Sequence, residues 1–164
     1  MKRSTHLTAA AVHEAAHAVI AVLLGLRAQA HLHRKKEGCG VTDIDAPPGR
    51  DGDERLLVAL VAGSVGEGRL LHQARQWHVS TEDAKAIVRL IGTIDDRSAK
   101  RLSAAKREAS ELVRDKQVWS AIEAVASQLA ESGSVTDAMV REAVRAAGLR
   151  PSSRSSAAAG AGRR

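Results

Sequence analysis

The chain has 164 residues, enough for one domain with a substantial core, and 44% of them are hydrophobic. Alanine is abundant, Phe and Tyr are absent and Trp occurs only twice, so the composition favours a mainly helical fold. The net charge of +6 arises mostly at the two ends of the chain, and few aromatic residues are available to stack on bases. Nucleic-acid binding is therefore disfavoured. We predict one domain over 1–149 and a disordered basic tail over 150–164.

The single cysteine, Cys39, excludes an intrachain disulfide and favours a cytoplasmic protein. The alternative is a secretory signal, because basic residues at 2–3, an apolar run at 18–26 and Ala-Gln-Ala at 28–30 imitate one. However, polar residues beginning at His13 interrupt the stretch that a signal peptide keeps uniform. The apolar run is also too short to span a bilayer. We therefore expect a cytoplasmic protein with no membrane span.

A first helix is expected over 5–24, with Ser4 or Thr5 as its cap and Gly25 as its stop. Short strands over 27–34 and 39–45 should form a hairpin around the turn that separates them. The Pro- and Gly-rich segment that follows, over 46–52, should be a loop.

A second, buried helix is expected over 53–73 and contains Gly63, Gly66 and Gly68. These glycines resemble a phosphate loop only superficially, because no strand precedes them and no Gly-Lys-Ser/Thr follows. We interpret them as sites of close helix packing and expect no ATP binding. Further helices are predicted over 82–94, with Ser80 or Thr81 as the cap, and then over 97–113, 117–131 and 136–147.

The chemistry is indicated by His13-Glu14-Ala15-Ala16-His17, an H-E-x-x-H pattern inside the first helix. Histidines four residues apart lie on one helix face and can share a metal ion, and neutral imidazole suits Zn²⁺. Glu14 lies about a quarter-turn away, where it can act as general base on a zinc-activated water. The flanking residues are apolar, so the helix should be buried. Burying unpaired polar groups costs several kcal/mol, which disfavours an accidental match.

A catalytic zinc ion needs a third protein ligand and an open fourth position. Leu23 stands where the longer H-E-x-x-H-x-x-G-x-x-H pattern has its third histidine, and Glu37 lies in the predicted turn. The third ligand must therefore come from farther along the chain. The candidates are Glu67, His72, His78, Glu82 and Asp83. Of the other histidines, His6 is expected in solvent, and His31 and His33 alternate on a strand and need no metal.

The order of these segments resembles the peptidase domain of the FtsH family, the membrane-tethered AAA proteases. The stretch over 13–19 is similar to the family's zinc helix, with Ala16 where the family usually has Gly. The resemblance extends over 5–147, in segments that include Gly40-Val41-Thr42, the small-residue helix 62–67, the segment 78–85, and Ser134-Val135-Thr136 before the last helix.

This resemblance implies a mainly α, FtsH-type zinc metallopeptidase domain with a small β-hairpin, in which Asp83 is the third zinc ligand. An acid in the first turn of a capped helix is compatible with that role, although a capping acid paired with Ser80 is the alternative. Glu67 is expected to orient a ligand histidine. We expect the protein to lack the family's ATPase module and membrane anchor, and the region after the third helix is shorter than in the family.

The expected substrate is a peptide or unfolded protein that adds to the strand edge at 40–44. A separate ATPase or a homo-oligomer is a possible partner.

Two other functions stay open. One is a non-catalytic relative with structural zinc, which a fourth ligand such as His78 would favour. The other is a basic adaptor that binds through its Arg-rich tail.

Overall fold

The computed structural model describes residues 8–33, 39–72, 79–93 and 95–152. The helices are α1 (Ala9–Leu23), α2 (Arg50–Leu70), α3 (Thr81–Ile91), α4 (Asp96–Arg114), α5 (Lys116–Ser132) and α6 (Asp137–Ala146). The strands are β1 (Arg27–Leu32), β2 (Gly40–Asp45) and β3 (Ser134–Val135). The predicted mainly α fold with a small β element is confirmed.

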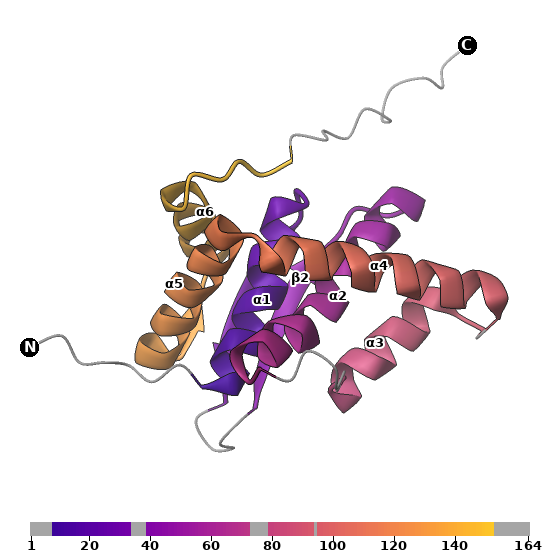
Figure 1. Cartoon of the computed structure of the whole chain (residues 1–164), viewed down its shortest axis with the longest axis horizontal. Coiled ribbons are helices and arrows are strands. Elements are labelled where there is room, and N and C mark those ends of the chain that lie inside the picture. The colour runs from indigo at the N-terminus through magenta and orange to yellow at the C-terminus, as the bar shows by residue number, and fades with distance from the viewer. Residues whose placement is uncertain (1–7, 34–38, 73–78, 94, 153–164) are drawn as a thin grey trace, which may run out of the picture.

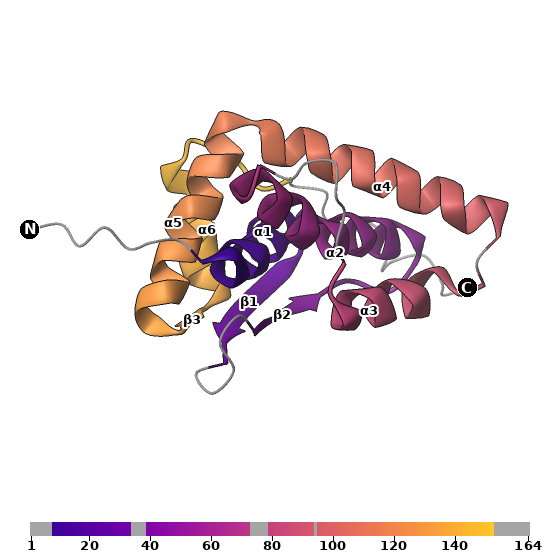
Figure 2. The same ribbon diagram turned by 60° about the horizontal axis from the view of Figure 1, so that its bottom comes forward.

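Helix α1 forms the centre of the molecule, and every residue over 11–22 is buried. Its alanines and β-branched residues present an apolar surface on all sides, so neighbours cover it completely. It packs against α2 on one side and α5 on the other, with the sheet beneath it (Figures 1 and 2). The polar residues of the H-E-x-x-H pattern are therefore held in the core of the protein.

Two helix starts differ from the expectation. Thr8 caps α1 by accepting a hydrogen bond from the Ala11 amide at 3.2 Å, whereas the expected caps Ser4 and Thr5 lie outside the described residues. Helix α2 begins at Arg50, inside the segment predicted as a loop, because Gly49 ends the loop with a φ of 107°. Glycine adopts a positive φ without steric cost, so the chain can turn at Gly49 and enter the helix at the next residue.

Later boundaries agree to within a few residues. Ser80 caps α3 as predicted, and the helix ends earlier than expected because Gly92 adopts a φ of 70°. In the predicted tail, the Ser152 amide donates to the Leu23 carbonyl at 2.8 Å, so the first tail residues pack on the end of α1. Residues 153–164 lie outside the described part of the chain.

The sheet has three strands in the order β2-β1-β3, whereas the sequence predicted a two-stranded hairpin. Strand β1 pairs antiparallel with β2, with Ala30 opposite Thr42, and on its other side with the two residues of β3. Strand β2 therefore forms one edge of the sheet, and its outer side has no partner strand in the described structure.

Helix α2 lies directly against α1 because two of its glycines face that helix. A Cβ atom at Gly66 would lie 2.7 Å from the Ala16 Cβ, too close for any side chain. The interpretation of these glycines as packing positions is thus confirmed for Gly66, and for Gly63 as described below. Helix α4 runs over α2, and α3 packs on α2 farther from α1 (Figure 2). No helix in the described residues is long and apolar enough to cross a membrane.

Candidate metal centre

Helix α1 and the first turn of α3 bring three potential metal ligands together. The Nε2 atoms of His13 and His17 lie 3.1 Å apart. Oδ2 of Asp83 lies 2.9 Å from the first of these nitrogens, and its Oδ1 lies 3.3 Å from the second. Two predicted histidines and the predicted third ligand thus converge, although Asp83 is 70 residues from His13 in the sequence.

Hydrogen bonds on the far side of each imidazole determine which nitrogen faces the cluster. Nδ1 of His17 lies 2.8 Å from the backbone carbonyl of Ala59, which can only accept a hydrogen bond. Nδ1 of His13 lies 3.1 Å from Oε2 of Glu67. In a neutral ring, a proton on Nδ1 leaves a lone pair on Nε2. Both Nε2 lone pairs then face each other and the Asp83 carboxylate, an arrangement that repels unless a cation or a proton lies between them.

The donor set fits Zn²⁺. Two imidazole nitrogens and a carboxylate oxygen are typical ligands of catalytic zinc. Ligands at about 2.0–2.1 Å from a tetrahedral zinc ion are separated from one another by about 3.3 Å. The observed separations of 2.9, 3.1 and 3.3 Å are close to that spacing. The three residues can therefore hold a zinc ion with little movement.

The pKa shifts show that the cluster attracts positive charge. Burial by itself would lower the pKa of His13, but the carboxylates of Asp83, Glu14 and Glu67 outweigh it and raise the pKa. Burial by itself would raise the pKa of Asp83, but hydrogen bonds with His13, His17 and Ser80 hold it well below its usual range. A proton or a metal ion satisfies the same requirement for a cation.

Asp83 makes contacts that are compatible with both roles that the sequence analysis left open. Its amide donates to Oγ of Ser80 at 3.1 Å, which is the helix cap, and its Oδ2 accepts from the same hydroxyl at 2.8 Å. The Ser80 hydroxyl therefore orients the carboxylate toward the histidines. The neighbouring acid, Glu82, is instead exposed and paired with Lys85 at 3.0 Å.

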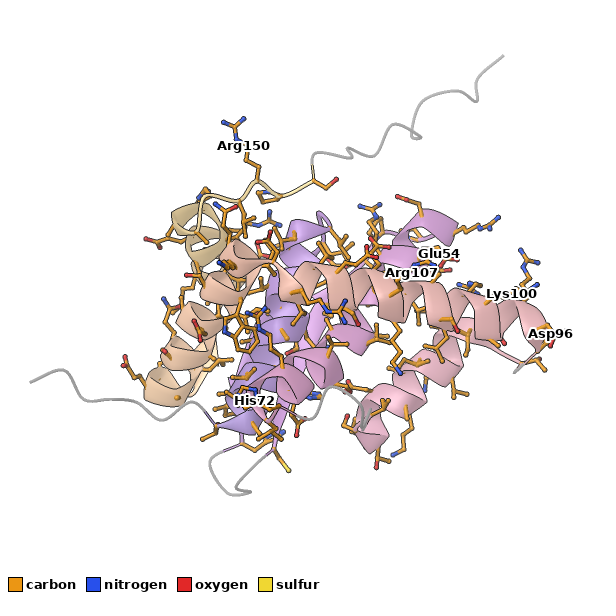
Figure 3. All side chains as sticks on the ribbon, in the orientation of Figure 1. Glu54, His72, Asp96, Lys100, Arg107 and Arg150 are labelled. Carbon is orange, nitrogen blue, oxygen red and sulfur yellow. The ribbon has the colours of Figure 1, made fainter. Side chains whose placement is uncertain are left out.

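Two other candidates for the third ligand, Glu67 and His72, do not join the cluster. Glu67 contacts the outer nitrogen of His13, as expected for a residue that orients a ligand. His72 lies exposed just beyond α2, with a φ of 53° (Figure 3). His78 lies outside the described residues.

Helix α2 can lie close to the candidate metal centre because residue 63 is a glycine. The sequence analysis interpreted Gly63 only as a site of helix packing. A Cβ atom there would lie 2.3 Å from Nε2 of His17 and 2.8 Å from Nε2 of His13. Any side chain at this position would therefore clash with both imidazole nitrogens. The spacing of Gly63 and Gly66 was the available signal, but it did not reveal that one of them faces the histidines.

Glu14 is 7% exposed and lies against β2. Oγ1 of Thr42 lies 2.7 Å from Oε2 of Glu14 and 3.1 Å from its backbone oxygen. At Gly40, an added Cβ would lie 2.5 Å from Cγ of Glu14, so the strand makes room for this side chain. No feature of the sequence indicated that Thr42 contacts the predicted base.

A cavity of about 510 Å³ opens beside the cluster. Its walls include His13, Glu14 and Glu67, together with residues at the hairpin end and the first residues of α3. This volume lies in the range of small-molecule and peptide side-chain sites. A ligand in the cavity would thus contact Glu14 and one member of the candidate metal centre, His13.

No protein-family model matches this chain, and a search of curated proteins finds no match. The likeness to FtsH peptidases therefore depends on the residues and segments described above.

Proposed function

We propose that the protein is a cytoplasmic, zinc-dependent metallopeptidase of the FtsH peptidase type, with His13, His17 and Asp83 as zinc ligands and Glu14 as general base. The observation that carries the proposal is the convergence of three lone-pair donors beside a buried glutamate that is not one of them. Two histidines and one carboxylate form a typical ligand set of catalytic zinc sites.

Zinc in this site would supply Lewis acidity to the peptide carbonyl and to the attacking water. The Glu14 carboxylate would accept a proton from that water and deliver it to the leaving amine. The acceptors on the outer imidazole nitrogens, Glu67 and the Ala59 carbonyl, keep the ligand nitrogens free of protons.

The free edge of β2 supports binding of an extended peptide. The His33 amide donates to the Cys39 carbonyl at 2.9 Å, so these two residues form a hydrogen-bonded pair. Hydrogen-bonded and non-hydrogen-bonded pairs alternate along antiparallel strands, and the next pair, Leu32 with Gly40, is therefore non-hydrogen-bonded. The backbone groups of Gly40, Thr42 and Ile44 therefore point away from β1, toward the open side. An incoming strand could pair with them by main-chain hydrogen bonds and carry its peptide bond past Glu14.

The test is Glu14→Gln in the zinc-loaded protein. This variant should keep the fold and bind zinc as the parent does, yet hydrolyse casein roughly 10²–10⁴-fold more slowly, because the amide cannot accept the proton. Glu131→Gln, a change at an exposed position on α5, is the matched control and should leave the rate unchanged. Cleavage by Glu14→Gln at the parent rate would overturn the mechanism. A parent that binds zinc but cleaves nothing would favour the non-catalytic binding module.

A further inference from the structure

The general base proposed above is held by a side chain from the substrate-binding strand. Thr42 lies on β2, opposite Ala30 of β1, and its side chain points toward α1 rather than toward solvent. Its hydroxyl proton can go to only one acceptor at a time. The 2.7 Å contact with the Glu14 carboxylate is shorter than the 3.1 Å contact with the Glu14 carbonyl, and a charged acceptor binds more strongly.

The steric surroundings give Glu14 little freedom to move. Its side chain is nearly buried, and the absent side chain of Gly40 leaves the space that it fills. Along this face of β2, Thr42 provides the hydroxyl and Gly40 provides the room. Removing the Thr42 hydroxyl would leave Oε2 of Glu14 without the one side-chain hydrogen bond that it makes among the described residues.

The backbone amide and carbonyl of Thr42 point toward the open edge of β2. Thr42 belongs to a non-hydrogen-bonded pair with β1, so its amide and carbonyl face the open edge where an extended peptide would bind. One residue thus touches the general base through its side chain and faces the substrate strand through its main chain.

We propose that Thr42 is a positioning residue: its hydroxyl fixes the Glu14 carboxylate relative to a peptide bound along β2. The inference rests on the proposed peptidase function. The strand that binds the substrate would then also hold the carboxylate of the base, which comes from α1.

Two substitutions separate the hydroxyl from the shape of the side chain. Thr42→Val keeps the branched shape and removes the hydroxyl, whereas Thr42→Ser keeps the hydroxyl and removes a methyl group. With labelled casein, Thr42→Val should lower kcat roughly 10–100-fold, because a misplaced catalytic group costs rate rather than binding. KM and zinc affinity should stay within about twofold, since neither the main chain nor a ligand has changed. Thr42→Ser should recover most of the lost kcat.

The matched control is Asp45→Asn, at an exposed position that ends the same strand, beyond the residues expected to pair with a substrate. It should leave kcat and KM unchanged. The proposal is overturned if Thr42→Val has the parent kcat, or if Thr42→Ser is as impaired as Thr42→Val while both lower the melting temperature equally. That second result would show a structural role only.

A measurement that needs no turnover keeps this inference separate from the proposed function. The carboxyl ¹³C resonance of Glu14, assigned by its loss in Glu14→Gln, should shift in zinc-loaded Thr42→Val and return in Thr42→Ser. An unchanged resonance in Thr42→Val would refute the contact itself. If the parent protein hydrolyses nothing, the peptidase proposal fails, and this resonance still decides whether Thr42 holds Glu14.

Discussion

Three donor atoms meet at the candidate zinc centre, and only the Asp83 carboxylate comes from outside α1. The two histidines occupy neighbouring turns of one helix and would be near each other in any conformation that keeps that helix. Asp83 reaches them only when α3 is correctly packed. At the scale of single residues, this carboxylate therefore couples metal binding to tertiary structure.

Asp83→Ala should weaken zinc binding by more than about a hundredfold and lower the melting temperature of the zinc-loaded protein, because binding to a folded site also stabilises the fold. Glu67→Ala, which removes a partner of His13 but not a ligand, should cost roughly 10–100-fold in affinity. Glu82→Ala should change little, since Glu82 is exposed and paired with Lys85. Calorimetric titration with zinc measures all three. Loss of binding in Glu67→Ala with normal binding in Asp83→Ala would mean that the third ligand was wrongly assigned.

Where helices α1 and α2 pack together, Gly63 and Gly66 face different residues of α1. Gly63→Ala should abolish zinc binding or weaken it by roughly a hundredfold or more, because the new methyl group would lie against both ligand nitrogens. Gly66→Ala, which meets the Ala16 Cβ, should lower the melting temperature of the zinc-free protein and affect zinc affinity less. Equal zinc affinities in the two variants would argue against a metal centre beneath Gly63.

Helix α3 is the most loosely held element around the site. Ile87 is its only fully buried residue, and its link to α1 runs through Asp83. Chelating zinc should therefore raise the amide exchange rate of α3 by roughly tenfold or more, while α5, which packs on α1 through a buried apolar face, should exchange as before. Hydrogen exchange followed by mass spectrometry measures both helices in one experiment. Equal protection of α3 with and without zinc would contradict the bridging role of Asp83.

The elements also show what could be predicted from the sequence. His13, Glu14 and His17 could be predicted because their relation is local to one helix, and helix periodicity fixes it. Asp83 required the family resemblance, since no local pattern relates residues 70 positions apart. Thr42 could not be predicted, because its role depends on which face of β2 meets α1. Strand β3 has only two residues, too few to show an alternating pattern.

For the whole molecule, a zinc ion in this site would link α1 to α3 through Asp83. A thousandfold excess of free zinc over its Kd should stabilise the native state by about 4 kcal/mol, which corresponds to about 8–16 °C in Tm for a chain of this size. The Tm of the purified protein, measured with zinc and with a chelator, tests this directly. Asp83→Ala should lose most of the increment, and identical melting curves for the parent would exclude a bound structural or catalytic metal.

The central position of α1 has a consequence for the order of events during synthesis. Helix α1 is synthesised before α5 and α6, which cover one of its sides, and β1 beside it is synthesised before its partner β3. The nascent chain can therefore contain all three proposed zinc ligands before α1 has its permanent neighbours. Stable incorporation of the metal should follow the synthesis of residues 116–146, so a ribosome-bound chain that stops before α5 should exchange its zinc far more readily than the released protein.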